Sequence, residues 1–199
     1  RVIQMEWLGY AKTKNLGNRE AHHDWILSLD ADEVLSAELQ NSLRNWKGKD
    51  NTIFYLDRIT SIGDYWVKHS GWYPDWKPRL FDRRHCSWDG DYVHEYLKTP
   101  QHFQSIKISG KLRHYSYSDD LDHLNRIDKY TELSAKKMYD LGKRSNHFRA
   151  IISGISRFLR TYFIKKGILD GSIGLKIAYR NAFMAYRKHV RLVQMHKTL

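Results

Sequence analysis

Apolar residues in the first part of the chain form short runs and alternations that predict β-strands separated by helices. Residues 25–29 (WILSL) form a continuous apolar run, which is typical of a strand buried on both faces of a sheet. Residues 2–5, 52–59 and 106–117 are rich in β-formers and predict three further strands. Residues 12–23 predict a helix that precedes the run at 25–29.

Start signals for helices and one long irregular region organise the middle of the chain. Ser36 is a suitable N-cap for a short helix that follows it. Residues 61–92 are dense in Gly, Trp, Tyr and Asp and predict a long loop region with short strands. Either Asp119 or Asp120 can cap a further helix, whose apolar positions extend from 121 to 133.

The last quarter of the chain has the periodicity of two amphipathic helices. Apolar residues recur at spacings of three and four between 148 and 163, and again between 175 and 190. The turn GILDG at residues 167–171 separates the two helices. Arginines and lysines lie among the apolar positions, so these helices could pack on the rest of the chain or lie in a membrane interface.

Strands that alternate with helices define the α/β class, and the helical last quarter suggests a domain boundary. With 199 residues, the chain is long enough for one domain with its own core and a helical appendage. We therefore expect an α/β domain in residues 1–142 and a basic helical tail in residues 143–199.

The distribution of charge favours the same boundary. Residues 1–142 contain 21 Lys and Arg and 21 Asp and Glu, whereas residues 143–199 contain 13 Lys and Arg and the single acid Asp170. The net charge of +12 therefore resides in the tail. A segregated basic segment indicates a polyanionic partner, which is anionic lipid or nucleic acid, or else a solvated cationic face.

Composition removes several classes of protein. Hydrophobic residues make up 41% of the chain and charged residues 28%, which excludes a disordered tail. No apolar stretch approaches the roughly 18–20 residues that a membrane-spanning helix needs, and no signal peptide is visible. Cys86 is the only cysteine, so no disulfide can form within the chain.

Two aspartates follow directly on the apolar run, in the sequence LDADE at residues 29–33. In open α/β sheets ligands bind beyond the carboxyl ends of strands, so Asp30 and Asp32 would lie at such an edge. Carboxylate oxygens suit Mg²⁺ or Mn²⁺, and either ion can neutralise a departing diphosphate. The alternative is a loop in which an aspartate merely leads into the helix at Ser36.

The run WILSLDADE at residues 25–33 resembles the metal-binding motif of family 2 glycosyltransferases. The preceding WLGYAKTKN at residues 7–15 resembles the segment that leads into the helix before that strand. Further motifs occur in the order seen in one bacterial subgroup, the lipopolysaccharide-core β-glucosyltransferase (WaaE-like) type. These motifs are KPRLF (77–81), YVHE (92–95), HYSY (114–117) and GILDG (167–171). The resemblance covers nearly the whole chain.

This resemblance implies a partial GT-A fold, a Rossmann-like mixed sheet that binds nucleotide-diphospho-sugars, with a C-terminal amphipathic helical extension. It implies an inverting enzyme that moves a hexose, with glucose expected, from a nucleotide diphosphate sugar to a lipid-linked or lipopolysaccharide-core glycan. The expected cofactor is Mg²⁺ or Mn²⁺. Family members begin with a strand and an Asp-rich segment that grips the base and ribose. This sequence has no such segment, and we expect about the first quarter of the domain to lie outside it.

Inverting transfer needs one general base, which deprotonates the acceptor hydroxyl as it attacks the anomeric carbon. The resemblance points to Glu95, with Asp89 and Asp91 as alternatives; Glu95 could instead be an exposed acid at a strand end. His94 is expected in the acceptor site, where it could orient Glu95 or a phosphate. His114 is expected to complete the metal shell or meet the diphosphate. Either histidine could instead be structural.

The remaining candidates are expected to bind the donor or the acceptor. The guanidinium of Arg79 suits a phosphate or a sugar hydroxyl, with a salt bridge to Asp75 or Asp82 as the alternative. Tryptophans could stack on an acceptor sugar or serve as core anchors. The expected donor-binding residues are Lys12, Lys14, Asn15, Asp30 and Arg79. The expected acceptor platform consists of Trp72, Trp76 and Trp88.

Together these expectations place the protein in the cytoplasm, peripheral on the inner face of the cytoplasmic membrane, with residues 143–199 against anionic lipid. Two other classes stay open: a nucleic-acid-binding module and a non-catalytic membrane-docking fragment. Nucleic acid is not the expected partner, because the charge is confined to the tail while the aromatics cluster in the balanced part of the chain.

Overall fold

The computed structural model of the chain describes residues 1–90, 95–117 and 131–196. The chain divides into two compact units that interleave along the sequence. Unit 1 comprises Arg1–Arg58 and Trp76–Leu112, and unit 2 comprises Ile59–Asp75 and Arg113–Leu199. The boundary at residue 142, which the charge pattern suggested, is a different kind of division and stays a prediction.

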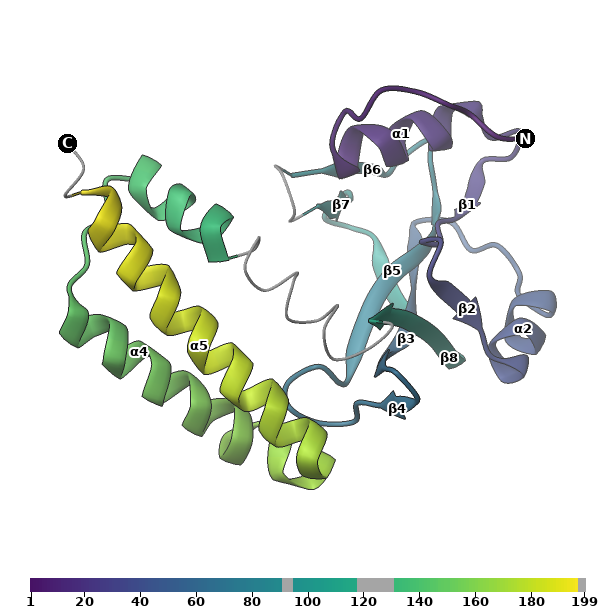
Figure 1. Ribbon diagram of the computed structural model, residues 1–199. Helices are drawn as coiled ribbons and strands as arrows, with labels where there is room; N and C mark the ends of the chain where they lie inside the picture. Colours follow the sequence, from purple (N-terminus) through teal and green to yellow (C-terminus); the bar gives the residue numbers. More distant parts are fainter. Residues whose placement is uncertain (91–94, 118–130, 197–199) are drawn as a thin grey trace. The chain divides into compact units, whose positions relative to one another are not determined.

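A six-stranded sheet has the order β1-β5-β3-β8-β2, with β4 paired to β3 (Figure 1). Its strands are β1 (Trp25–Leu27), β2 (Glu33–Leu35), β3 (Thr52–Ile62), β4 (Tyr65–Trp66), β5 (Asp75–Asp82) and β8 (Gln104–Tyr117). β1 runs antiparallel to β5, with Trp25 opposite Asp82 and Leu27 opposite Leu80. A small second sheet pairs β6 (Ser87–Asp89) with β7 (Tyr96–Lys98).

Helices flank these strands and fill the last third of the chain. They are α1 (Tyr10–Glu20), α2 (Ala37–Arg44), a helical stretch at 131–140, α4 (His147–Leu159), the π-helix η1 (Arg160–Ile164), the 3-10 helix η2 (Gly167–Asp170) and α5 (Gly171–Met195). The expected fold class is therefore confirmed: a mixed α/β structure consistent with a partial Rossmann-like GT-A fold, with a long C-terminal helix.

Neighbouring residues of the strands in unit 1 enter two separate hydrophobic clusters. Phe54 and Leu80 pack in one cluster with Leu39 of α2, whereas the adjacent Ile53 and Phe81 pack in the other. Successive side chains of a strand point to opposite faces of the sheet, so the two clusters lie on its two sides. The first cluster contains α2, and the second contains β6, β7 and part of α1.

The start of α2 is fixed to β8 by Ser36. The Ser36 hydroxyl accepts a hydrogen bond from the backbone N–H of Leu39 at 3.2 Å, as an N-cap, and another from that of Lys111 at 2.9 Å. Next to Lys111, Gly110 has a φ of +104°, and a Cβ there would lie 2.3 Å from the backbone nitrogen of Leu39. Only glycine permits this close approach of helix and strand.

In unit 2, α4 and α5 lie side by side and are joined through η1 and η2 (Figure 1). Asp170, at the end of η2, is buried, and its carboxylate accepts four hydrogen bonds. The donors are the hydroxyls of Tyr65 and Ser70 and the backbone N–H groups of Lys68 and His69, at 2.8 to 3.2 Å. These contacts tie the segment at 65–70 to the start of α5.

Most of the predicted elements are confirmed. The helices near 12–23 and after Ser36, the strands near 52–59 and 106–117 and both tail helices occur within a few residues of their expected ranges. The start of the helix expected after Asp119 or Asp120 lies outside the described residues. Within the parts of the chain that the structure describes, no helix has the length and apolarity needed to cross a membrane.

Three expectations about strands were wrong. Residues 2–5 form neither helix nor strand, and Val2 is almost fully exposed. β1 has only three residues and stands at the end of the strand order in the described chain, which leaves Leu27 and Leu29 more than a third exposed. β5, an eight-residue strand inside the sheet, falls within the region expected to be mostly loop.

Replacing Ser36 with alanine is expected to lower the free energy of unfolding by about 1–2 kcal/mol, because the backbone N–H groups of Leu39 and Lys111 both lose their acceptor. Urea unfolding followed by circular dichroism measures the change. Ser42→Ala, in the middle of the same helix, is the matched control and should be close to neutral. Equal stabilities of the two variants would contradict the assigned capping role.

Candidate functional site

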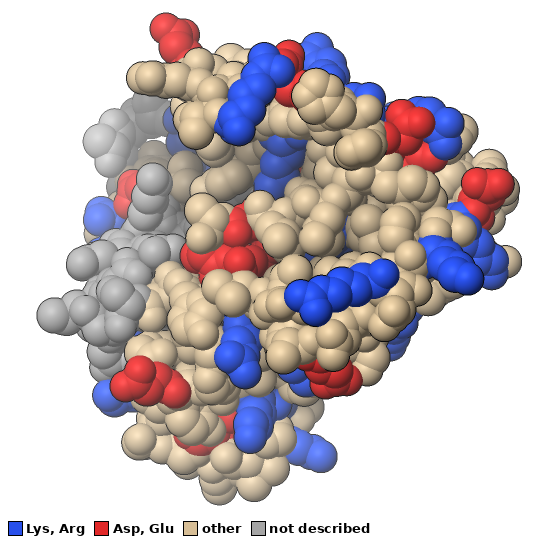
Figure 2. Space-filling view, turned by 90° about the vertical axis from the view of Figure 1, so that its right-hand side faces the viewer, with Lys and Arg blue, Asp and Glu red and all other residues tan. Residues whose placement is uncertain are grey.

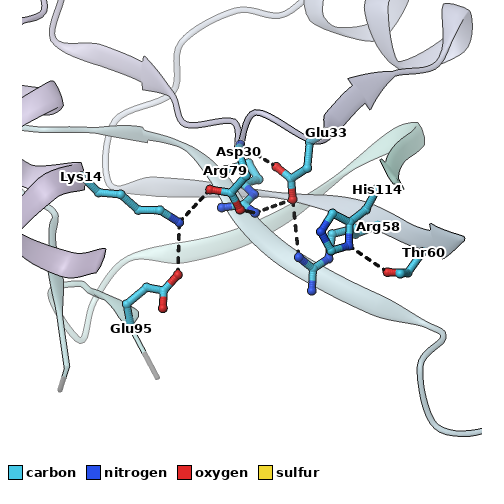
Figure 3. Close-up of polar contacts among 8 residues, drawn as sticks. All are labelled: Lys14, Asp30, Glu33, Arg58, Thr60, Arg79, Glu95 and His114. Atoms are coloured by element: carbon cyan, nitrogen blue, oxygen red, sulfur yellow. Dashed lines mark hydrogen bonds and ion pairs between the residues drawn. The ribbon is translucent and has the colours of Figure 1, made fainter. Parts of the chain in front are cut away.

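Six charged side chains gather in unit 1 around the turn that follows β1 (Figure 3). They come from helix α1, from the turn between β1 and β2, from β2, β3 and β5, and from the residue before β7. This charge network consists of Lys14, Asp30, Glu33, Arg58, Arg79 and Glu95. Lys14, Asp30, Arg79 and Glu95 were expected from the sequence to belong to the site, and the structure brings these four together.

Arg79 is the buried centre of the network. Its Nη2 lies 2.6 Å from Oδ2 of Asp30 and 2.5 Å from Oε1 of Glu33. The Glu33 side chain is fully buried and is approached by a second guanidinium, Arg58, at 3.5 Å. Glu33 also accepts a hydrogen bond from the backbone N–H of Asp30 at 3.1 Å. Buried charges are tolerated only when they are paired and hydrogen-bonded, and this arrangement meets both conditions.

Lys14 joins the network to Glu95. Its Nζ lies 3.0 Å from Oδ1 of Asp30 and 3.2 Å from Oε1 of Glu95, and 4.6 Å from the centre of the Trp88 ring. The next residue, Asn15, holds the backbone of Trp88 with two hydrogen bonds, of 2.7 and 2.8 Å. Asn15 therefore fixes α1 against β6, and this contact aims Lys14 at the two carboxylates.

The charges of the network reinforce one another. Burial of Asp30 opposes its ionisation, but the nearby Arg79 and Lys14 outweigh this effect and hold the pKa of Asp30 below its usual value. Burial likewise disfavours the charged form of Arg79, but Glu33 and Asp30 raise its pKa. Both groups are therefore charged at neutral pH, and the turn after β1 keeps a fixed negative group next to fixed positive ones.

Lys12 and Asp32 belong to unit 1, each two residues along the sequence from a member of the network, Lys14 or Asp30. Asp32 is half-buried in the turn just before β2. Lys12 lines a cleft of about 630 Å³ together with Asn15, Arg83 and Cys86. Burial and the neighbouring Asp82 raise the pKa of the Cys86 thiol to about 11, so this cysteine is no nucleophile at neutral pH.

The three tryptophans expected to form an acceptor platform occupy different environments. Trp88 is buried against Phe81 in the second core cluster of unit 1, which leaves its ring little surface for a sugar. Trp76, in β5, has the ammonium of Lys107 4.5 Å from its ring centre. Trp72 belongs to unit 2, where the centre of its ring lies 5.6 Å from the centre of the Tyr117 ring.

The histidines divide in a similar way. His114 belongs to unit 2, where its Nδ1 lies 3.1 Å from the hydroxyl of Thr60. His94 and the alternative base Asp91 lie outside the described residues. The other alternative base, Asp89, is exposed and accepts hydrogen bonds from the backbone of Gly90 at 2.7 Å and from the hydroxyl of Tyr96 at 3.3 Å.

A divalent ion at Asp30, Asp32 and His114 stays a prediction. In residues 1–90, 95–117 and 131–196, no group of three or more His, Cys, Asp or Glu side chains is arranged to hold a metal ion by itself. Asp30 and Asp32 therefore offer at most two protein carboxylates from the turn after β1.

Glu33 and Arg58 belong to the network but were not among the expected site residues. Glu33 directly follows the two aspartates, and its position at the start of β2, next to the apolar Val34 and Leu35, was the available signal. Arg58 follows Asp57 inside the otherwise apolar strand β3, and such a charged pair in a buried strand needs partners. Asp57 finds its partner in the ammonium of Lys111.

No family model matches the chain, but curated proteins are similar over nearly all of it. An uncharacterized glycosyltransferase of Rickettsia prowazekii is 25% identical over 98% of this chain and 70% of its own length. A second one, from Rickettsia felis, is 24% identical over 100% of this chain and 73% of its own length. The lipopolysaccharide core biosynthesis glycosyltransferase LpsC of Rhizobium meliloti is 24% identical over 95% of this chain and 73% of its own length. These similarities support a transferase that acts on sugars.

Replacing Arg79 with leucine is expected to lower the free energy of unfolding by about 3 kcal/mol or more, because the buried Glu33 loses its closest cation. Urea unfolding at neutral pH measures the loss. Arg84→Leu removes an exposed guanidinium that pairs with Asp82 and is the control, with little change expected. Equal stabilities of the two variants would show that the network does not hold this part of unit 1 together.

Proposed function

We propose that this chain is an inverting glycosyltransferase that moves a hexose, glucose in our reading, from a nucleotide diphosphate sugar to a lipid-linked or lipopolysaccharide-core glycan. The observation that carries the proposal is the contact of Lys14 with both Asp30 and Glu95. One ammonium group thereby joins a carboxylate at a strand end to the candidate general base. The similarity to glycosyltransferases, one of them named for lipopolysaccharide core biosynthesis, supports the reaction class.

The donor would bind at the turn after β1. A nucleotide diphosphate is strongly negative, and Lys14 and Arg58, whose side chains are 16% and 18% exposed, are the cations of the network that are open to solvent. We assign the donor contact to Lys14, because it also contacts Asp30 at the turn and Glu95. Arg79 is almost completely buried, so we assign it the role of holding Asp30 and Glu33 in place. Lys12 and Asn15 lie on the same helix, and both line the cleft. Asn15 also holds the backbone of Trp88.

A divalent ion fits this site if the substrate supplies part of its coordination. Mg²⁺ is commonly held by one or two carboxylates together with substrate phosphates. Asp30 and Asp32 provide that number. Each oxygen of Asp30 pairs with a cation, Oδ1 with Lys14 and Oδ2 with Arg79, so an ion that binds Asp30 would take the place of the Lys14 ammonium. When bound, the ion would neutralise the charge that develops on the departing diphosphate.

Glu95 is the proposed general base. Its carboxylate is mostly buried, is held by Lys14 at 3.2 Å and keeps about a fifth of its surface exposed to an incoming acceptor. As the acceptor oxygen forms its bond to the anomeric carbon, the bond from that carbon to the diphosphate oxygen breaks with inversion. The proton of the acceptor hydroxyl passes to Glu95, and the bonding electrons leave with the nucleotide diphosphate.

We place this reaction in the cytoplasm, at the inner face of the cytoplasmic membrane. A lipid-linked acceptor requires the catalytic site to work at a bilayer, and the basic segment at 143–199 suits anionic head groups. Nucleic acid is not the proposed partner, because the excess positive charge lies in the tail while the aromatic residues cluster in the balanced part of the chain.

Replacing Glu95 with glutamine is expected to lower kcat by about 10²–10⁴-fold while donor affinity changes less than twofold, since a base acts only in the transfer step. Transfer of radiolabelled glucose from UDP-, ADP- or GDP-glucose to a truncated lipopolysaccharide core measures the first, and calorimetric titration of the donor measures the second. Asp89→Asn is the matched control, with near-normal turnover expected. Equal loss of turnover and donor affinity would show that Glu95 serves binding or folding instead.

Removal of the metal provides a second, independent test. EDTA is expected to abolish Mn²⁺-dependent transfer because it withdraws the ion. The Asp32→Ala variant is expected to do the same because the ion loses a protein ligand. Electron paramagnetic resonance of Mn²⁺ with nucleoside diphosphate should show weaker binding to Asp32→Ala than to the unmodified chain. The exposed Asp64→Ala in unit 2 is the control. Full activity in EDTA would remove the metal from the proposal.

A further inference from the structure

Helix α4 packs on α5 through its smallest residues. The buried residues of α4 are Ala150 and Gly154. A Cβ on Gly154 would lie 3.4 Å from both the carbonyl oxygen of Ala182 and the Cβ of Tyr186, so the two helices approach closely at this glycine. The face that α4 turns to its neighbour is therefore built from small side chains rather than from its large apolar ones.

The large apolar residues of α4 form an outward face. They recur at spacings of three and four, which places them on one side of the helix. Each is between 47% and 72% exposed, and they are Phe148, Ile151, Ile152, Ile155 and Leu159. Helices of globular proteins normally turn such a stripe toward the core, so α4 is arranged in the reverse sense.

The exposed apolar surface continues through the connection from α4 to α5. Four large apolar residues of η1 and η2 are between 51% and 73% exposed, and they are Phe163, Ile164, Ile168 and Leu169. We call this surface, together with the outward face of α4, the apolar stripe. A contiguous apolar surface of this kind on a folded chain usually marks a site of interaction.

Cationic side chains border the apolar stripe. Arg149 and Arg157 of α4 and Arg160 at the start of η1 are exposed. Arg157 is eight residues after Arg149 and three before Arg160, so the three lie on one side of the helix, away from the large apolar residues. Lys165 and Lys166, also exposed, follow at its end. The only acid of the tail, Asp170, is buried with its four donors and does not offset this charge at the surface. By contrast, the face in Figure 2 shows acidic and basic side chains interspersed.

We propose that the apolar stripe docks on an anionic lipid bilayer, with the aliphatic and aromatic side chains in the interface and the arginines at the head groups. An interfacial helix of this kind combines a buried apolar face with Lys and Arg that meet anionic lipid. A second copy of the chain would bring the same arginine-bordered faces together, which like charges oppose. A nucleic acid would satisfy the charge but would leave isoleucines and leucines exposed, because its bases stack on aromatic rings.

This docking surface rests on the membrane placement given under the proposed function, but it does not depend on the sugar transfer itself. Lipid binding is measured without donor or acceptor, so its failure and the failure of the glycosyltransferase proposal are separate results. Sugar transfer without binding to vesicles would support the glycosyltransferase proposal and contradict the docking surface. Binding to vesicles without sugar transfer would support the docking surface and contradict the glycosyltransferase proposal.

Vesicle cosedimentation of the full chain tests the proposal. The chain should bind vesicles of phosphatidylethanolamine and phosphatidylglycerol and bind pure phosphatidylcholine vesicles at least tenfold more weakly. Ile151→Ser with Ile155→Ser should weaken binding to the anionic vesicles about tenfold or more, because two inserting side chains are lost. Both positions are exposed, so circular dichroism should show an unchanged fold. Arg157→Gln with Arg160→Gln should weaken binding and reduce its sensitivity to salt.

Matched substitutions elsewhere separate this surface from general hydrophobicity or charge. Val34→Ser with Leu141→Ser removes two equally exposed aliphatic side chains, and Arg44→Gln with Lys47→Gln removes two exposed cations of unit 1. Neither pair should change vesicle binding more than twofold. Equal binding by the α4 variants and these controls overturns the proposal. So does a result in which the α4 substitutions abolish self-association or oligonucleotide binding but leave vesicle binding intact.

Discussion

A buried guanidinium held between two carboxylates is the interaction on which the candidate site depends. Arg79 of β5 contacts Asp30 and the fully buried Glu33, and neither partner can leave without stranding a charge in the protein interior. The three residues of β1 pair with Leu80–Asp82 of β5, and the backbone N–H of Ser28 donates to the carbonyl of Arg79 at 2.7 Å, so β5 also holds the turn that follows β1. Lys14 can then meet Asp30 and Glu95 at defined distances, and the proposed chemistry follows from that arrangement.

The fold could be predicted where the signal is local. The capping serine before α2 and the apolar periodicity of α4 and α5 lie within single elements, and these elements are found where expected. Pairing between distant strands leaves weaker marks. β5 contains a lysine and a proline in its first half, so its sequence lacks the alternation of apolar and polar residues that predicts a strand. The apolar run after Asp24 predicted an interior strand. A strand is interior only if other strands pair with both of its edges, and in the described sheet β1 pairs with β5 alone.

The site was likewise predictable only where its residues belong to local motifs. Lys14, Asp30, Arg79 and Glu95 were each recognisable from motifs, although Lys14 and Glu95 are 81 positions apart and only the fold brings them together. Glu33 and Arg58 were not predicted, because their only signal is a charged residue in or beside an apolar strand, and that signal does not identify the partners. The side chain of Asn15 holds the main chain of Trp88, and this contact orients Lys14. The ligand-binding roles of Asn15 and Trp88 stay predictions. The metal ion and the role of His114 stay predictions.

The carboxylate of Asp170 has a mechanical consequence. It stands where η2 gives way to α5 and grips the main chain of Lys68 and His69, so the helical hairpin and the segment at 65–70 move as one piece. Within unit 2 the hairpin and the segment at 65–70 therefore share one anchor, and loss of the Asp170 carboxylate would release both at once.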